Sequence, residues 1–185
     1  GLKVYLGGTL FESFIIRGMY EEYKDLLRKW NLKMCEVSDG SIEIDHKEKC
    51  NYISDLSEEF LVVSEVGSKD ENKDLRTDLW IELMQKELEA GSWKVIAEAR
   101  EGGNVGVFGK EGKVKSDLID QIIKNVPSEK IIWEAPIKQQ QVWFIKLLGA
   151  NVNLGNISHN EIIPLETLRI GLRGDTFFDY INSKQ

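Results

Sequence analysis

The chain has 185 residues, enough to bury one sizeable core, so a single domain is expected. Its hydrophobic fraction of 42% and charged fraction of 30% are those of a globular protein, and no apolar run reaches the roughly 20 residues that span a membrane. The net charge of −7 argues against nucleic acid as the main partner, and an anionic ligand would need a bound cation or clustered basic side chains. Two cysteines, Cys35 and Cys50, make no disulfide framework, so reduced thiols and a cytoplasmic location are expected.

Apolar strands alternate with amphipathic helices along the chain. The first half predicts strands over residues 2–6, 32–37 and 60–65, and helices over 11–30, 45–55 and 74–90. The second half predicts strands over residues 93–99, 130–135 and 152–156, helices over 116–125, 139–148 and 162–173, and a glycine-rich loop over 102–114. Strict alternation of this kind predicts a parallel sheet with right-handed crossovers.

Four of the predicted strands finish in a glutamate. The four are Glu36, Glu65, Glu98 and Glu134, and they are spaced by 29, 33 and 36 residues. This spacing fits one strand-plus-helix unit per repeat. In a (β/α)₈ barrel every strand presents its carboxyl end to the active-site mouth, whereas a doubly wound sheet concentrates polar ends at its switch point. We therefore expect a (β/α)₈ barrel of the TIM type, with the four carboxylates meeting at one mouth.

Carboxylates at the ends of buried strands predict a metal site. They are costly there unless they are paired or bound to a cation, and oxygen ligands suit Mg²⁺. For any one glutamate the competing interpretation is a salt bridge. Lys69, four residues after Glu65, is the best candidate for proton transfer, and the alternative is a solvated lysine in the charged run 69–73.

Two other strand ends carry groups that can hold anions. Arg100 follows Glu98 by two residues and can clamp a carboxylate or a phosphate through its guanidinium. The alternative is an ion pair with Glu98 or Glu101. Gly155, in the strand over 152–156, allows the backbone to approach a ligand, and a loop before a helix N-terminus can bind phosphate. A structural turn is the alternative there.

The strand-end segments also carry a resemblance. They are Gly-Gly-Thr-Leu-Phe-Glu at 7–12, Glu-Val-Ser-Asp-Gly at 36–40, Ser-Glu-Val-Gly-Ser-Lys at 64–69, Glu-Ala-Arg at 98–100, Glu-Ala-Pro at 134–136, Asn-Val-Asn-Leu-Gly-Asn at 151–156 and Leu-Glu-Thr-Leu-Arg-Ile-Gly-Leu-Arg at 165–173. Together they resemble the phosphosulfolactate synthase family, over essentially all of the chain. Members of that family are (β/α)₈ barrels that add sulfite to phosphoenolpyruvate with Mg²⁺. The product, (2R)-phospho-3-sulfolactate, feeds coenzyme M synthesis or sulfolactate formation.

The resemblance implies roles for residues at these positions. Lys69 would protonate C2 of the substrate as general acid, and Arg100 is the second expected catalytic residue. The expected metal-side carboxylates are Glu65, Glu98, Glu134 and Glu36, and the expected substrate-binding residues are Ser38, Asn153, Gly155 and Asn156. The expected partners are the small molecules phosphoenolpyruvate and sulfite, with neither nucleic acid nor membrane, and a homo-oligomer is compatible with the sequence.

The chain departs from the family in one respect. Two further βα units precede the Gly-Gly-Thr-Leu-Phe-Glu motif in the family, and six predicted strands here agree with their absence. We therefore expect a source protein of roughly 250 residues, with the chain as given poorly active or inactive. Two other functions stay open: a non-catalytic stress-associated or interaction protein on the same barrel scaffold, as in a plant heat-stress group, and an aldolase in which Lys69 forms a Schiff base.

Overall fold

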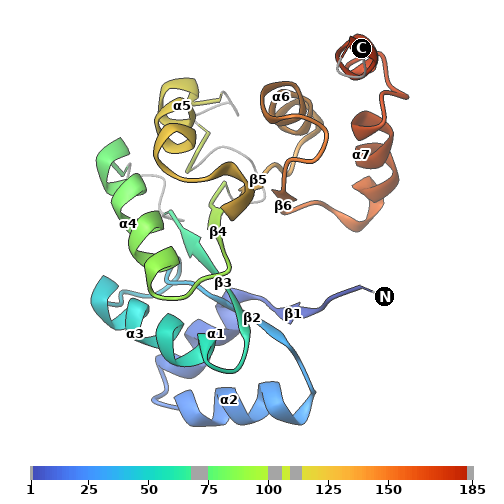
Figure 1. Cartoon of the computed structure of the whole chain (residues 1–185). Helices are drawn as coiled ribbons and strands as arrows, with labels where there is room; N and C mark the ends of the chain where they lie inside the picture. The colour runs from blue at the N-terminus through green and yellow to red at the C-terminus, as the bar shows by residue number, and fades with distance from the viewer. Residues whose placement is uncertain (1, 68–74, 100–105, 109–113, 183–185) are drawn as a thin grey trace.

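Six parallel strands form one curled sheet in the computed structural model, which describes residues 2–67, 75–99, 106–108 and 114–182. The strands are β1 (Tyr5–Leu6), β2 (Met34–Val37), β3 (Leu61–Val66), β4 (Lys94–Ala97), β5 (Ile131–Glu134) and β6 (Leu154–Gly155). Each strand pairs with the next in sequence, so the strand order never reverses as it would in a doubly wound sheet. Figure 1 shows the strands along an open arc with helices on its outer side. The predicted α/β fold is confirmed, with six strands arranged as in part of a (β/α)₈ barrel.

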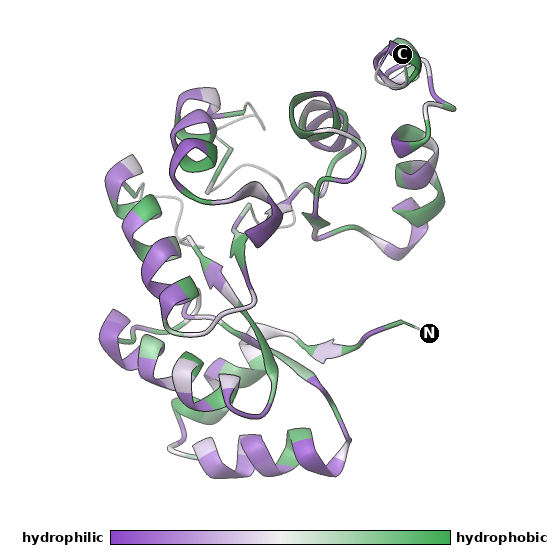
Figure 2. Ribbon diagram, in the orientation of Figure 1, coloured by the Kyte–Doolittle hydropathy of each residue, from purple (hydrophilic) through white to green (hydrophobic). Residues whose placement is uncertain are grey.

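The helices connect the strands and cover the outside of the arc. They are α1 (Gly8–Ile15), α2 (Tyr20–Lys29), α3 (His46–Ser57), α4 (Thr77–Glu89), α5 (Ser116–Asn125), α6 (Lys138–Leu148), α7 (Ile162–Arg169) and α8 (Phe177–Asn182). The predicted cap of α3 is confirmed, because the Asp45 carboxylate accepts the backbone N–H of Lys47 at 3.0 Å. Figure 2 shows hydrophobic and hydrophilic residues alternating along the helices, as expected where one face covers a sheet. Within the described residues, no helix has the length and apolar character to cross a bilayer.

Two helix predictions were wrong in extent. The helix predicted over residues 11–30 is divided into α1 and α2, because Gly18 takes a left-handed backbone with φ of 68° between them. The helix predicted over residues 162–173 ends at Arg169, and a further helix, α8, forms in a tail for which none was predicted. Thr176 ties this tail to α7 by donating its hydroxyl to the main-chain oxygen of Leu168 at 2.6 Å.

The sheet has an apolar layer on each face. Outside, one cluster around Trp80, Trp133 and Phe144 packs the later helices on the strands, and another around Phe11 and Tyr23 packs the earlier ones. Inside, a small cluster is formed by Met34, Val63, Ile96 and the partly buried Ile132. Side chains alternate along a strand, so the residue two positions after each of these four points to the same inner side. Those residues are Glu36, Glu65, Glu98 and Glu134.

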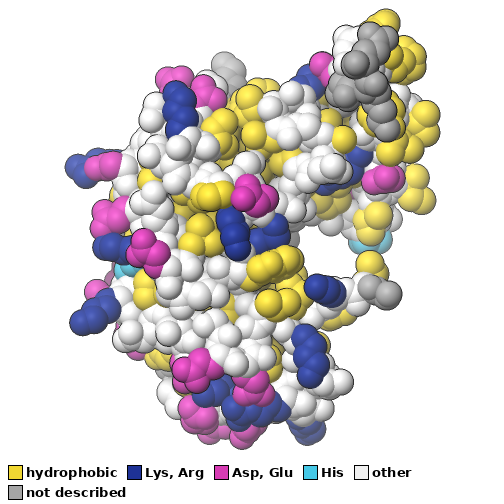
Figure 3. Space-filling model, in the orientation of Figure 1, with side chains coloured by type: hydrophobic (Ala, Val, Ile, Leu, Met, Phe, Trp, Pro, Cys, Tyr) yellow, Lys and Arg dark blue, Asp and Glu magenta, His cyan; other side chains and the backbone are white. Residues whose placement is uncertain are grey.

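The arc is open between its first and last strands. Within the described residues, β1 pairs only with β2 and β6 only with β5. Figure 3 shows a gap between the N-terminal segment and the C-terminal helices. Large apolar side chains are exposed near both edges, among them Leu2, Val4, Ile162 and Ile163. In the part of the chain that the structure describes, the sheet therefore does not close into a full barrel.

A buried ion pair joins α3 to α4 behind β3. Lys49 is 1% exposed and Glu87 is fully buried, with the ammonium 2.8 Å from the Glu87 carboxylate. Burial alone would raise the pKa of Glu87, but the Lys49 charge outweighs that effect and the net result is a lowered pKa. Burial alone would lower the pKa of Lys49, but the charges of Glu87 and Asp39 raise it. Both side chains are therefore charged at neutral pH.

We expect the Glu87→Gln variant to lose stability in a pH-dependent way. Because the folded pKa of Glu87 lies below its unfolded value, near 4.3, the carboxylate contributes stability above that pH and loses it as pH falls through the folded pKa. Breaking a buried pair costs roughly 3–5 kcal/mol. In urea unfolding, the deficit of the variant should be full at pH 7 and should shrink as pH falls from about 5 to about 3. A deficit that stays constant over this range would contradict the assignment.

Candidate functional site

Three glutamates at the carboxyl ends of adjacent strands meet on the inner side of the sheet. Glu65 is the last but one residue of β3, Glu98 directly follows β4, and Glu134 ends β5. Each offers a carboxylate oxygen within 4.8 Å of those of the other two. Glu65 is 7% exposed, Glu98 is 2% exposed and Glu134 is half-buried. The structure thus brings together three of the four carboxylates that the strand ends suggested, and we call them the three-carboxylate group.

The three-carboxylate group suits a hard divalent cation. Mg²⁺ binds oxygen ligands at about 2.1 Å, so two ligands on opposite sides of the ion lie about 4.2 Å apart. Separations of up to 4.8 Å can therefore close around one ion through small side-chain movements. Mg²⁺ commonly keeps water and substrate oxygens in its remaining positions. The donor chemistry fits the predicted metal, and binding itself stays a prediction.

The phenol of Tyr5 responds to negative charge on the inner side of the sheet. Its pKa is raised first by burial and then by the charges of Glu36, Glu134 and Glu65. Nearby negative charges raise the pKa of a phenol because they disfavour the phenolate. Glu36, Glu65 and Glu134 therefore all place negative charge near the Tyr5 phenol, on the inner side of the sheet. A cation that bound in this region would enter a negative potential.

Main-chain contacts hold two members of the three-carboxylate group. The Glu134 carboxylate accepts the backbone N–H of Ala99 at 2.8 Å, which ties the end of β5 to the residue after Glu98. The main-chain oxygen of Glu65 accepts a hydrogen bond from the Lys49 ammonium at 2.6 Å. The positions of these acids are therefore set by the backbone and by a buried lysine.

Glu36, the fourth predicted metal-side carboxylate, is not part of the three-carboxylate group. Its Oε1 instead accepts the backbone N–H of Gly8, at the start of α1, at 2.8 Å. Ser38, a predicted substrate-binding residue, is fully buried and donates its hydroxyl to Oε1 of Glu12. Both side chains therefore face the N-terminal part of α1.

Glu12 is a candidate site residue that the sequence reasoning missed. It is 1% exposed, and its Oε2 has no hydrogen-bond partner within the described residues. A buried carboxylate oxygen without a partner is costly, and such groups are frequent in functional sites. The only sequence signal was its place at the end of the Gly-Gly-Thr-Leu-Phe-Glu motif.

Gly67 allows the chain to turn beside Glu98 directly after β3. Its φ is +143°, and a Cβ built on it would lie 2.4 Å from the Cβ of Glu98. We expect Gly67→Ala to destabilise the protein by about 1–3 kcal/mol, because an L side chain is strained in this backbone conformation. The variant should also bind Mn²⁺, a substitute for Mg²⁺, more weakly than the wild type, because the added methyl group displaces Glu98.

Thermal unfolding and an electron paramagnetic resonance titration with Mn²⁺ would measure the two effects. The matched control is Gly174→Ala, because no atom lies within 4 Å of a Cβ at Gly174. Equal results for the two alanine variants would show that Gly67 has no special part in placing Glu98.

Gly155, on β6, lies beside the three-carboxylate group. It pairs in register with Glu134, and a Cβ there would lie 2.9 Å from the Ile132 side chain. The close approach that requires glycine here is therefore made by a side chain of the neighbouring strand β5. Asn156 follows with a positive φ of 54°. The substrate-binding roles of Gly155 and Asn156 stay predictions.

Asn153 is held away from the carboxyl ends of the strands. Its side-chain amide donates to the main-chain oxygens of Glu129 at 3.2 Å and Ile131 at 3.1 Å. These oxygens lie at the start of β5, at the opposite end from Glu134. The structure therefore gives Asn153 a part in joining β5 to β6 and does not bring it to the three-carboxylate group.

The two predicted catalytic residues, Lys69 and Arg100, lie outside the described residues. Each follows closely on a residue that contacts the three-carboxylate group. Lys69 comes two positions after Gly67, which packs against Glu98, and Arg100 comes directly after Ala99, which donates to Glu134. Their roles stay predictions.

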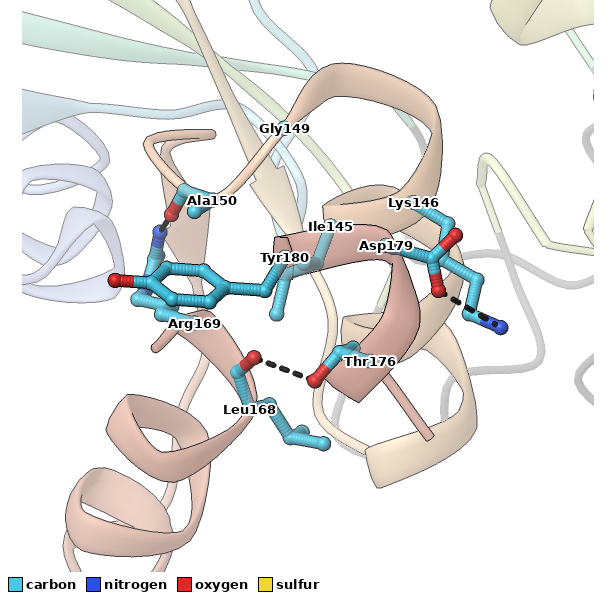
Figure 4. A pocket seen from close by; sticks show the side chains of 9 residues that line it. All are labelled: Ile145, Lys146, Gly149, Ala150, Leu168, Arg169, Thr176, Asp179 and Tyr180. Atoms are coloured by element: carbon cyan, nitrogen blue, oxygen red, sulfur yellow. Dashed lines mark hydrogen bonds and ion pairs between the residues drawn. The ribbon is translucent and has the colours of Figure 1, made fainter. Parts of the chain in front are cut away.

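A cavity of about 120 Å³ lies elsewhere, between α6, α7 and α8. Around this cavity, Figure 4 shows Thr176 hydrogen-bonded to the main-chain oxygen of Leu168, and Lys146 paired with Asp179. Arg169, which also lines it, donates to the main-chain oxygen of Val152, before β6 begins. The cavity therefore belongs to the packing of the C-terminal helices, at the opposite end of β6 from the carboxylates.

Comparison with known proteins finds similarity to phosphosulfolactate synthases over most of the chain. The family model described as (2R)-phospho-3-sulfolactate synthase (ComA) matches residues 1–175. A phosphosulfolactate synthase of Methanocaldococcus jannaschii is 48% identical over 181 residues, which cover 96% of this chain and 72% of that protein. A phosphosulfolactate synthase of Bacillus subtilis is 43% identical over 180 residues, covering 96% of this chain and 71% of that protein. An Arabidopsis thaliana protein named Heat-stress-associated 32 is 33% identical over 108 residues, covering 58% of this chain and 35% of that protein.

Proposed function

The chain belongs to the phosphosulfolactate synthase family of enzymes, and we propose that it adds sulfite to phosphoenolpyruvate with Mg²⁺, giving (2R)-phospho-3-sulfolactate. The observation that supports the metal most directly is the three-carboxylate group, in which acids from three adjacent strands lie within 4.8 Å of one another. In (β/α)₈ barrels the carboxyl ends of the strands are where catalytic residues lie.

The proposed reaction is an addition in which no group leaves. The sulfur lone pair of sulfite forms a bond to C3 of phosphoenolpyruvate, and the electron pair of the C2–C3 double bond moves toward C2 and the substrate carboxylate. A proton from the Lys69 ammonium then ends on C2, and its delivery from one side fixes the R configuration. The phosphate ester stays on the oxygen of C2.

The charges of the reactants explain the residues that we assign to them. Phosphoenolpyruvate and sulfite are anions, and the chain has a net charge of −7. Mg²⁺, when bound by Glu65, Glu98 and Glu134, would stabilise the negative charge that builds on the substrate carboxylate. Arg100 and the segment of Gly155 and Asn156 would hold the remaining anionic groups. Both cysteines are free, which suits the reducing cytoplasm that we propose as the location.

The test is an assay of phosphoenolpyruvate consumption by the intact protein. We expect consumption only when sulfite and Mg²⁺ are both present, and none after removal of metal by a chelator. Consumption without sulfite would contradict the addition reaction. No consumption under any condition, with no shift in thermal unfolding on adding the ligands, would instead favour a non-catalytic protein on this scaffold.

A further inference from the structure

We propose that Lys49 is a positioning residue for the three-carboxylate group, a role that rests on the metal site of the proposed function. Its ammonium donates to the main-chain oxygen of Glu65 at 2.6 Å and to the carboxylate of Asp39 at 2.8 Å. The Glu87 carboxylate lies 2.8 Å from the same nitrogen. The ammonium therefore makes two hydrogen bonds, to Asp39 and to the Glu65 carbonyl, and an ion pair with Glu87.

The three partners of Lys49 come from three different segments of the fold. Glu65 is on β3 and its side chain belongs to the three-carboxylate group. Asp39 follows Ser38 in the segment after β2, and Glu87 is on α4. One buried nitrogen, carried by α3, therefore holds the carboxyl end of β3 relative to the end of β2 and to the helices behind them.

The contact with the Glu65 carbonyl distinguishes this role from that of a stabilising ion pair. An ion pair between Lys49 and Glu87 would join α3 to α4 without any bond to β3. The additional bond fixes the main chain of Glu65 at the residue whose side chain enters the three-carboxylate group. Removing a partner that is hydrogen-bonded to a metal-ligating group commonly changes metal affinity by about 10- to 100-fold, and we expect a loss of similar size for a contact that fixes the main chain of a ligand.

The position of each charge suggests variants that separate the two roles. Asp39 keeps 28% of its side chain exposed, so water can solvate it when Lys49 is lost. Glu87 is buried and has only His46, at 3.4 Å, as a second basic neighbour in the described part of the chain. Loss of Lys49 alone would therefore leave a buried charge, whereas Lys49→Met combined with Glu87→Gln removes both charges of the buried pair.

The experiment compares this double variant with Glu87→Gln alone in the intact protein. Mn²⁺ affinity is measured by electron paramagnetic resonance, and Tm is measured without metal. Glu87→Gln keeps the bond from Lys49 to the Glu65 carbonyl, so we expect a lower Tm with nearly unchanged Mn²⁺ affinity. The double variant should regain Tm but bind Mn²⁺ about 10- to 100-fold more weakly than the wild type.

The outcomes separate this inference from the metal site on which it rests. Wild-type Mn²⁺ affinity in the double variant would overturn the positioning role alone. The same conclusion would follow if Mn²⁺ affinity fell and recovered together with Tm across the two variants. Absence of Mn²⁺ binding by the wild-type protein would overturn the metal site and the positioning role together. If the double variant fails to fold, Lys49→Arg keeps the charge but cannot repeat the three contacts, and it should show the same loss of affinity.

Discussion

The Glu65→Gln variant is expected to bind Mn²⁺ about a hundredfold more weakly than the wild-type protein, with a loss of kcat/KM at least as large. The substitution keeps the size of the side chain and removes one of three negative charges. Glu65 is 7% exposed, so water has little access to take the place of the missing ligand. A titration with Mn²⁺ by electron paramagnetic resonance would give the affinity, and a phosphoenolpyruvate assay would give the kinetic effect.

The same substitution at Glu36 is the matched control. Glu36 also faces the inner side of the sheet at a strand end, but its carboxylate contacts the backbone N–H of Gly8 and is not in the three-carboxylate group. We expect Glu36→Gln to bind Mn²⁺ nearly as tightly as the wild type. Equal losses in the two variants would mean that the acids act only through their general negative charge. Wild-type affinity in Glu65→Gln would exclude Glu65 as a ligand.

The Lys69→Ala variant is expected to lose about 10²- to 10⁴-fold in kcat while binding Mn²⁺ normally. The reason is that the variant keeps the metal-side carboxylates and lacks only the proposed proton donor for C2. A reaction run in D₂O would show the protonation step directly, because the wild-type product should carry deuterium at C2. Steady-state kinetics and the Mn²⁺ titration together separate loss of chemistry from loss of binding.

Lys73→Ala is the control for Lys69, because the two lysines share one charged segment of the chain. Its kcat should stay close to that of the wild type. Borohydride should not inactivate the wild-type protein, because a lysine that acts only as an acid forms no imine. Full activity of Lys69→Ala would remove Lys69 from the mechanism, and inactivation by borohydride in the presence of substrate would favour the aldolase interpretation.

The fold was largely predictable because buried parallel strands leave a strong signal. β3 has five of its six residues buried, so it appears in the sequence as a continuous apolar run. Helix ends were harder to predict. The apolar spacing of residues 11–30 continues through Gly18, but a glycine in the left-handed conformation ends α1 there. A periodic pattern describes which faces are buried and does not show where a backbone turns.

The site was partly predictable for a related reason. The acids lie two residues after inner-facing apolar residues, so the alternation of a strand already placed them on the inner side. The sequence does not show that Glu36 turns toward Gly8 or that Glu12 is buried, because these contacts depend on how α1 packs. Lys49 did leave a signal, since it precedes Ile53 and Leu56 by four and seven residues on the buried face of α3. A lysine at such a position indicates a buried partner, but only the structure shows which one.

The most direct measurement is X-ray diffraction from crystals of the protein grown with Mn²⁺, using the anomalous signal of the metal. We expect one anomalous peak on the inner side of the sheet, within about 2.3 Å of carboxylate oxygens of Glu65, Glu98 and Glu134. A peak at another place, or none at saturating Mn²⁺ with these side chains turned apart, would contradict the proposal that acids from three strands bind one cation.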